Sequence, residues 1–131
     1  MKFSILTLAA AVPALAAVVP DSIDTVEVKR DNCKLTLQWV KNWHKAALRR
    51  YRVQLITTPR NDDHIHKYCD LFKQGGMGVE NIQCFWTDDG KYVIDDSQAE
   101  GSVGHGEYLN RFKQTAHYFE LITGCDTVQN L

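Results

Sequence analysis

The chain has 131 residues, a formal net charge of −1 and 24% charged residues. This balance excludes the excess of positive charge that general binding to nucleic acid or to anionic membranes requires. The length suits one small domain with a modest core, and the four cysteines offer covalent support for it.

The first residues have the pattern of a secretory signal peptide. A short positive start precedes an apolar run over residues 3–17, which contains an alanine-leucine-alanine pattern ending at Ala16. The run is shorter than the roughly 20 residues that a membrane-spanning helix needs. We therefore expect residues 1–16 to be removed on export, with cleavage after Ala16 or Ala17, and we expect no membrane span in the secreted product.

A polar segment follows the leader and ends in the dibasic pair Lys29-Arg30. A dibasic pair between a leader and the first cysteine resembles the site of a kexin-type processing protease in the fungal secretory pathway. It predicts a propeptide over residues 17–30 and a single mature domain over residues 31–131; the alternative is a solvated charge pair in a flexible arm. Residues 1–30 carry three basic and three acidic side chains, so the mature domain keeps a formal charge of −1.

Two strands are predicted at the start of the mature domain. Residues 33–40 alternate between apolar and polar side chains, and so do residues 51–57, as half-buried strands do. The residues that we expect to face inward are Leu35, Leu37 and Trp39 in the first strand and Tyr51, Val53 and Leu55 in the second. Residues 42–50, between these strands, fit either a short helical turn or a long hairpin loop.

A helix is predicted over residues 62–74. Asn61 or Asp62 can cap its start, because a side-chain oxygen accepts from the free backbone N–H groups of the first turn. A stripe of apolar residues recurs at three- and four-residue steps until the chain reaches Gly75-Gly76. The residues of this stripe are Ile65, Tyr68, Cys69 and Phe72.

The second half of the domain begins with a predicted hairpin. Strands over residues 81–87 and 91–96 flank Asp88-Asp89-Gly90, where glycine provides the left-handed conformation of a tight turn. The elements expected after it are a glycine-containing loop over residues 98–106, a helix over 107–117, a strand over 118–123 and a loose tail over 126–131.

This order of elements predicts an α+β fold. From Tyr51 onward it reads strand, helix, strand, strand, helix, strand, which is the order of the ferredoxin-like split βαβ sandwich. That fold has an antiparallel sheet with two helices on one face. The additional N-terminal strand, residues 33–40, is expected to extend an edge of the sheet or to cover it.

All four cysteines lie in the predicted mature domain, and an even number in an exported chain predicts two disulfides. Sequence alone allows three pairings. The predicted topology places the first helix near the strand that contains Cys84, which favours Cys69 with Cys84 and leaves Cys33 with Cys125. The alternative, a zinc site at His64, His66 and Cys69, lacks the usual C-x2-C spacing, so no metal and no cofactor are expected.

The leader, the segment ending in Lys29-Arg30 and the small cysteine-containing domain together resemble the small secreted proteins of filamentous fungi. The predicted order of strands and helices is similar to that of killer-toxin-like and ferredoxin-like effector candidates in that group. The resemblance implies a secreted protein that binds a protein partner in a host or a competitor, and so a role in virulence. It covers the architecture of the whole chain and rests on no single motif.

Trp43, Arg49 and Arg50 are the candidate binding residues. Trp43 is surrounded by cationic side chains, and aromatic and cationic groups together suit a protein interface. The neighbouring charges form either a basic face or a solvated edge; they are Lys41, Lys45, Arg49, Arg50 and Arg52. Trp39 and Trp86, in contrast, share their strand faces with aliphatic residues and are expected in the core.

Two other functions remain open at this stage. A small secreted hydrolase of ribonuclease type requires two acid–base groups and a cation around a phosphate. His105, Glu107, Arg111 and His117 are residues of these types, although nothing in the sequence fixes their geometry. A carbohydrate- or cell-wall-binding module would instead use exposed aromatic rings. No catalytic residue is assigned, and the oligomeric state stays open.

Overall fold

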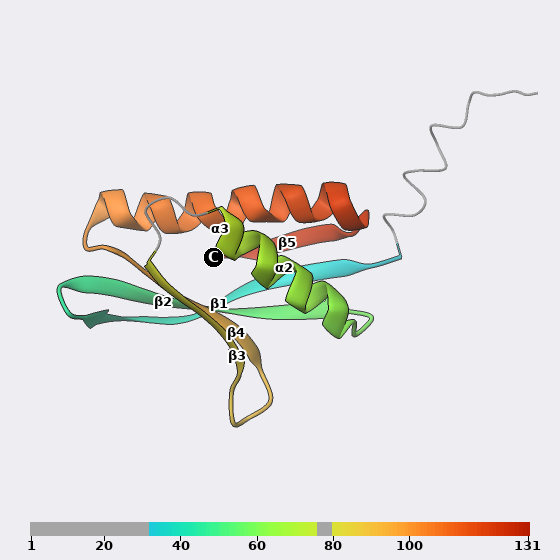
Figure 1. Ribbon diagram of the computed structural model, residues 1–131, viewed down its shortest axis with the longest axis horizontal. Helices are drawn as coiled ribbons and strands as arrows, with labels where there is room; N and C mark the ends of the chain where they lie inside the picture. Colours follow the sequence, from blue (N-terminus) through green and yellow to red (C-terminus); the bar gives the residue numbers. More distant parts are fainter. Residues whose placement is uncertain (1–31, 76–79) are drawn as a thin grey trace, which may run out of the picture. The chain divides into compact units, whose positions relative to one another are not determined.

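A computed structural model describes residues 32–75 and 80–131 of the chain (Figure 1). The predicted signal peptide, the propeptide and the processing residues Ala16, Lys29 and Arg30 lie outside the described residues. The domain that begins at Cys33 forms a compact unit of its own.

This domain is a mixed α+β structure with a five-stranded sheet and two helices. The strands are β1 (Lys34–Lys45), β2 (Leu48–Thr58), β3 (Glu80–Trp86), β4 (Tyr92–Ala99) and β5 (Asp126–Asn130). The helices are α2 (Asp62–Gln74) and α3 (Ser102–Thr123). Their sequence order is β1, β2, α2, β3, β4, α3 and β5, and the spatial order of the strands is β3-β4-β2-β1-β5.

β1 and β2 form a long hairpin, which resolves the ambiguity of residues 42–50. The two-residue loop is Ala46-Ala47, and both residues have positive φ values, 52° and 67°. This combination is typical of the type I′ turn, whose twist matches that of the flanking strands. A register shift between Trp39 and Lys41 interrupts the hairpin, so the alternation of side chains between the two faces changes phase there.

Helix α2 has the bounds that the sequence predicts. The side chain of Asn61 accepts a hydrogen bond from the backbone N–H of His64 at 3.1 Å and caps the first turn. The stripe of Ile65, Tyr68, Cys69 and Phe72 is buried against the sheet and α3. The prediction of this helix is therefore confirmed.

Helix α3 differs from the prediction, because it covers the expected loop and the expected last strand. It begins at Ser102, where the buried Gly104 lies so close to β4 that an added Cβ would be 1.7 Å from the carbonyl oxygen of Ala99. It continues to Thr123 because residues at helical spacing, Tyr108, Phe112, Ala116 and Phe119, all enter the core. The prediction of a strand over residues 118–123 is therefore wrong, because these residues are the last part of α3.

The expected C-terminal tail is also a regular element. Gly124 ends α3 in the left-handed conformation at φ 76°, and its N–H donates to the carbonyl of Glu120. The chain then turns into β5, which pairs in parallel with β1. The sheet is therefore mixed, whereas a purely antiparallel sheet was predicted.

Strand order separates this domain from a simple split βαβ sandwich. In that fold the last strand lies beside the first strand of the βαββαβ unit, here β2. In this structure β1 occupies that position, and β5 lies on the far side of β1. The N-terminal strand is thus an internal strand of the sheet, which corrects the expectation that it extends or covers an edge.

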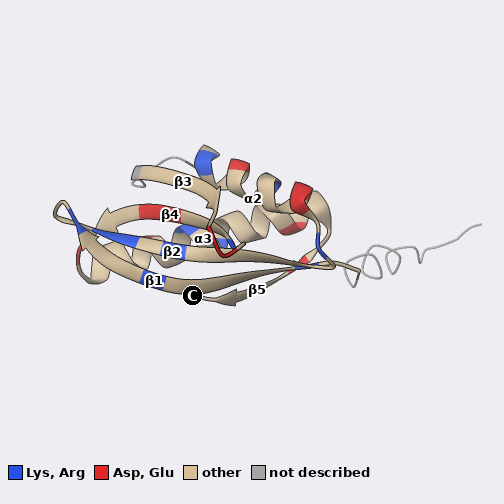
Figure 2. Ribbon diagram, turned by 90° about the horizontal axis from the view of Figure 1, so that it is seen from below, with Lys and Arg blue, Asp and Glu red and all other residues tan. Residues whose placement is uncertain are grey.

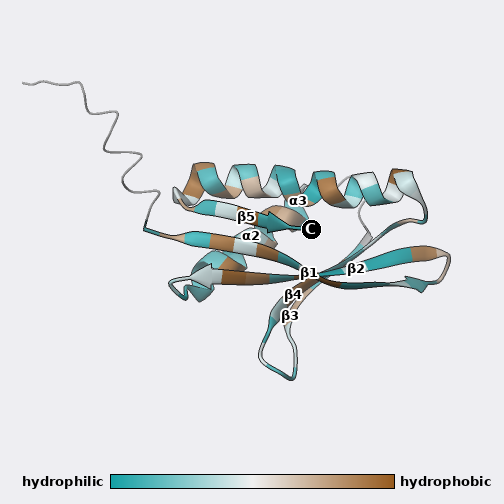
Figure 3. Cartoon of the chain, turned by 180° about the vertical axis from the view of Figure 1, so that it is seen from behind, coloured by the Kyte–Doolittle hydropathy of each residue, from teal (hydrophilic) through white to brown (hydrophobic). Residues whose placement is uncertain are grey.

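Both helices pack on one face of the sheet (Figures 1 and 3). The core fills the space between the helices and the sheet. The disulfide Cys69–Cys84 joins α2 to β3, and the disulfide Cys33–Cys125 joins the start of β1 to the end of α3. These are the two pairs that the predicted topology favours. The second bridge connects residues 92 positions apart, so the two ends of the domain are held side by side.

Candidate functional site

The face of the sheet that carries no helix is polar and aromatic. Residues paired across neighbouring strands share a face, so the strand register places Trp43 beside Arg50 and Lys41 beside Arg52. It also places Arg52 beside Asp95. Figure 2 shows basic segments on β1 and β2 next to an acidic segment on β4. This helix-free face is the candidate functional site.

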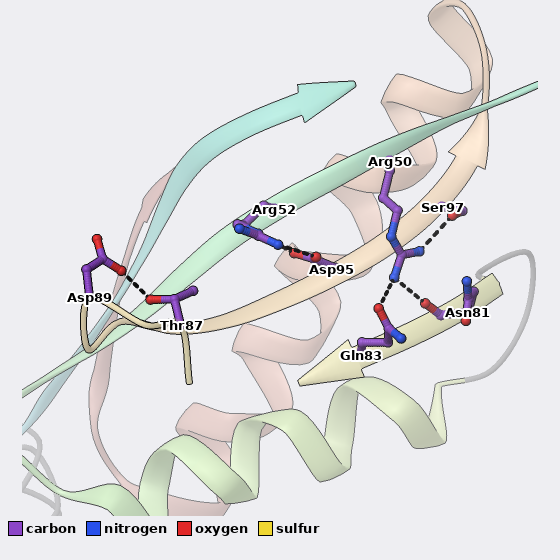
Figure 4. A network of polar contacts seen from close by, with 8 residues as sticks. All are labelled: Arg50, Arg52, Asn81, Gln83, Thr87, Asp89, Asp95 and Ser97. Carbon is purple, nitrogen blue, oxygen red and sulfur yellow. Dashed lines mark hydrogen bonds and ion pairs between the residues drawn. The ribbon is translucent and has the colours of Figure 1, made fainter. Parts of the chain in front are cut away.

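Arg52 lies at the centre of this face. Its guanidinium donates two hydrogen bonds to the carboxylate of Asp95, both at 2.8 Å (Figure 4). The guanidinium carbon also lies 5.5 Å from the ring centroid of Trp43 and 5.3 Å from that of Phe85. The hydrogen bonds to Asp95 raise the pKa of Arg52 above its usual value, so the guanidinium stays charged.

Lys41 extends this arrangement toward solvent. Its ammonium group is 5.1 Å from the ring centroid of Trp43, within the distance of a cation–π interaction. Two cations and two aromatic rings from three strands therefore form one continuous surface. We call Lys41, Trp43, Arg52 and Phe85 the cation–aromatic cluster.

Arg50 lies on the same face but is buried, with 3% of its surface exposed. It donates hydrogen bonds of 2.8 Å to Ser97 Oγ, to the backbone carbonyl of Asn81 and to Gln83 Oε1 (Figure 4). Asn81 has φ 56° at a register shift of β3, and its carbonyl accepts from Arg50. Arg50 is thus a buried support of the face and offers almost no surface for contact.

All three acceptors of Arg50 are neutral groups, which affects the charge of the whole face. Asp95 is paired with Arg52, so it does not hydrogen-bond to Arg50. The balance of Lys41, Arg50 and Arg52 against Asp95 is therefore positive in this part of the sheet.

Arg49, the third candidate binding residue, lies on the opposite face, because adjacent strand residues point to opposite sides. Its Nε is 3.1 Å from Glu100 Oε1, and it also donates to the side chain of Asn42. His44 shares the same carboxylate. Hydrogen bonds from His44 and then Arg49 lower the pKa of Glu100. The structure therefore does not bring Trp43, Arg49 and Arg50 together as one exposed cluster.

Sequence reasoning named Arg52 only as part of a possible basic face, and it missed Phe85 and Asp95 as members of the site. Alternation along β2 places Arg50 and Arg52 on one face, and this signal was available. The pairing of Arg52 with Asp95 and Phe85 depends on the register between β2, β4 and β3, which one sequence does not reveal.

Two tryptophans expected in the core are exposed. Trp39 has 40% of its surface exposed and lies next to the register shift of β1. Trp86 is 42% exposed at the end of the edge strand β3, with its ring 5.1 Å from that of Tyr92 and under the guanidinium of Arg60 at 5.4 Å. Trp86 lines a cleft of about 170 Å³.

The two histidines considered for a hydrolase do not meet, whereas Glu107 and Arg111 line one cleft of about 400 Å³. His105 and His117 lie on the same helix, and twelve residues of helix separate them by about 18 Å. Arg111, between them, is buried and donates to the backbone carbonyl of Phe72. The helix therefore does not bring His105 and His117 to one phosphate.

The zinc alternative is corrected by the disulfides. Cys69 is bonded to Cys84 and so has no thiolate to offer a metal. Within residues 32–75 and 80–131, no three His, Cys, Asp or Glu side chains are grouped as a metal site requires.

One carboxylate is buried on the helix-covered face of the sheet. Asp96 is fully buried, and Gln98 donates to its Oδ2 at 3.0 Å, whereas its Oδ1 has no hydrogen-bond partner. Burial raises the pKa of Asp96 to about 6, and the more distant charges of Arg50 and Arg111 oppose this shift only in part.

None of the helices among the described residues combines the length and apolar character needed to cross a bilayer. A scan against protein-family models finds no match, and searches of curated proteins and of solved structures find no match either.

Proposed function

We propose that this protein is exported, is cut after Lys29-Arg30 and acts outside the cell by binding a partner protein through the helix-free face of its sheet. Two disulfides support this proposal, because such bonds persist in oxidising compartments. The leader pattern supports export, and the dibasic pair supports cleavage in the secretory pathway. The resemblance to secreted fungal effectors and toxins suggests a partner in a host or a competitor.

The cation–aromatic cluster is the observation that carries the proposal. Trp, Tyr, Phe and Arg are the residue types enriched at protein interfaces, since they offer large contact area and fixed hydrogen-bond geometry. Here the bidentate ion pair with Asp95 holds Arg52 against both rings, so little side-chain freedom is lost on binding. The positive balance of the face suits a partner with acidic side chains around an apolar contact.

The test compares capture of extracellular proteins by the wild-type mature domain and by two variants. Lys41→Glu reverses an exposed charge of the cluster, and Lys113→Glu makes the same change on the exposed side of α3 as a matched control. We expect Lys41→Glu to weaken binding of the captured partner at least tenfold, which corresponds to about 1.4 kcal/mol. We expect the control to bind like the wild type.

A third variant, Trp43→Ala, removes the ring that both cations contact. It should weaken binding of the same partner while circular dichroism shows a folded domain. Equal affinity of the wild type, Lys41→Glu and Trp43→Ala for every captured protein would rule out this face as the binding surface.

The exposed Trp86 favours carbohydrate binding as a second candidate function. The cleft beside Trp86 suits one sugar ring rather than a polysaccharide chain. Aromatic rings provide apolar faces on which sugars can pack. Binding of the domain to cell-wall polysaccharide that is abolished by Trp86→Ala and retained by Trp43→Ala would support this function instead.

A further inference from the structure

One of the two disulfides has a histidine ring beside it. The Nδ1 atom of His64 lies 3.6 Å from Sγ of Cys125, which is bonded to Cys33. A disulfide sulfur carries no hydrogen, so the ring N–H is the donor in this contact. The first turn of α2 therefore offers a hydrogen bond to a sulfur atom that lies between α3 and β5.

The ring of His64 is held in this position from two sides. The backbone N–H of His64 donates to the side chain of Asn61 at 3.1 Å, which fixes the start of the helix. The ring meets the buried ring of Phe119 edge-on, with centroids 5.7 Å apart and an interplanar angle of 88°. The donor is therefore already placed beside the sulfur and needs no rearrangement to act on it.

The two sulfur-bearing residues of this bridge differ in access. Cys125 has 1% of its surface exposed, whereas Cys33 is half-buried at the start of β1. Thiol–disulfide exchange requires a thiolate to attack one sulfur and to expel the other. An incoming thiolate therefore reaches Cys33, and Cys125 is the leaving group.

The second bridge provides a comparison within the same molecule. Cys84 is half-buried and Cys69 is 4% exposed, so this bridge also combines one accessible and one buried residue. Cys69, however, belongs to the apolar core, and among the residues that the structure describes it has no counterpart of His64. A donor at the leaving sulfur stabilises the departing thiolate, and an apolar environment disfavours it. The two bridges should therefore differ in their rates of exchange.

We propose that the Cys33–Cys125 bridge is a site of thiol–disulfide exchange with low-molecular-mass thiols of the glutathione class. The thiolate attacks Sγ of Cys33, the bond to Sγ of Cys125 breaks, and its electron pair passes to Cys125. The N–H at Nδ1 of His64 donates to the new thiolate. The products are a mixed disulfide at Cys33 and a free Cys125. A second thiol then displaces Cys33, which yields the oxidised thiol dimer and two reduced cysteines.

This inference is independent of the proposed binding face and of the processing step, because it uses no residue of either. Thiols of this class keep cysteines reduced in the cytosol, so we expect the exchange where the protein meets such an environment. Opening the bridge releases a loop closure that spans 92 positions of the chain, so the exchange lowers the free energy of unfolding.

The order and position of the adducts test the proposal on the secreted protein itself. The protein is incubated with reduced glutathione, samples are trapped with iodoacetamide over time, and the cysteine peptides are mapped by mass spectrometry. We expect glutathione on Cys33 and alkylation of Cys125 several-fold sooner than any change at Cys69 or Cys84. Equal rates for the two bridges, or a first adduct on Cys125, would overturn the proposal.

Variants of His64 test the role of its ring. His64→Leu removes the donor and should slow exchange at Cys33–Cys125 several-fold without changing the rate at Cys69–Cys84. His66→Leu is the matched control, since its exposed ring packs against Tyr92, and it should leave both rates unchanged. His64→Asn keeps an N–H donor close to the position of Nδ1 and should exchange faster than His64→Leu.

The direction of the change separates this role from simple packing. Loss of a ring that only covers the bridge would make the sulfurs more accessible and the exchange faster. An unchanged or faster exchange in His64→Leu, or equal rates in His64→Leu and His64→Asn, would therefore overturn the proposal. If His64→Leu does not fold, the comparison of the two bridges in the wild type still decides.

Discussion

Buried and half-buried charged side chains dominate the residue-scale chemistry of this domain. Arg50 is held by three neutral acceptors, Arg52 by a carboxylate and two rings, and Asp96 by a single hydrogen bond from Gln98. Several hydrogen bonds stabilise the charges of Arg50 and Arg52. One carboxylate oxygen of Asp96, in contrast, has no hydrogen-bond partner. Ionisation of Asp96 therefore lowers the free energy of unfolding.

Replacing Asp96 by Asn should therefore stabilise the domain at neutral pH. The pKa of Asp96 is about 6 in the folded state against 3.8 for an ordinary aspartate, so the folded state keeps a proton that the unfolded chain releases. The contribution of protonated Asp96 to the free energy of unfolding is fully present below pH 4 and is lost as the pH rises to 6 and above. The loss is about 3 kcal/mol for a shift of about two pKa units.

Urea unfolding at several pH values checks this prediction. We expect the difference in unfolding free energy between Asp96→Asn and the wild type to grow in favour of the variant from pH 4 to pH 7. A difference that is constant over this range, or that grows in favour of the wild type, would contradict the raised pKa.

At the scale of elements, local signals determined what the sequence predicted well. Helix α2 has an N-cap at Asn61 and a stop at Gly75, and its bounds agree with the prediction. Helix α3 has glycines in its first turns and an alternating pattern over residues 118–123, which favoured a loop and a strand. Strand β5 pairs with β1, some ninety residues earlier, so no local pattern reveals it.

Gly104 and Gly106 provide a matched test of how α3 begins. A Cβ at Gly104 would meet the backbone of Ala99 at 1.7 Å, so Gly104→Ala should destabilise the domain by about 1–3 kcal/mol. A Cβ at Gly106 meets nothing within 4 Å, and Gly106→Ala should be neutral or stabilising by up to about 1 kcal/mol. Equal melting temperatures of the two variants would contradict the close packing of α3 on β4.

In the cation–aromatic cluster, too, the sequence predicted what depends on neighbouring residues and missed what depends on pairing between distant strands. Trp43 was identified from its neighbours in the sequence, and it does belong to the cluster. The register shift between Trp39 and Lys41 sets which face Trp43 occupies relative to the preceding strand residues. The register between β2, β4 and β3 brings Asp95 and Phe85 to Arg52, and one sequence does not reveal this register either.

For the whole molecule, the strand order and the Cys33–Cys125 disulfide together join the two ends of the domain. The α+β class follows from the alternation of elements, whereas the central place of β1 depends on contacts between distant segments. Because the disulfide closes a loop of nearly the whole domain, it restricts the unfolded chain more strongly than Cys69–Cys84 does.

Removing each disulfide in turn should show this difference. Cys33→Ser with Cys125→Ser should cost about 4–5 kcal/mol of unfolding free energy, and Cys69→Ser with Cys84→Ser about 3 kcal/mol, from the lengths of the two loops. Denaturant unfolding of the two double variants provides the comparison. A larger loss from the shorter loop would show that contacts near Cys69 and Cys84 outweigh the entropy of loop closure.

The account as a whole depends on an exported domain that is cut before Asp31 and cross-linked twice. Intact-mass analysis of the secreted protein, with and without reduction and alkylation, tests all three features together. We predict a chain of residues 31–131 whose four cysteines react with alkylating agent only after reduction. A secreted product that starts at Met1 or Ala17, or cysteines that are alkylated without reduction, would contradict the account.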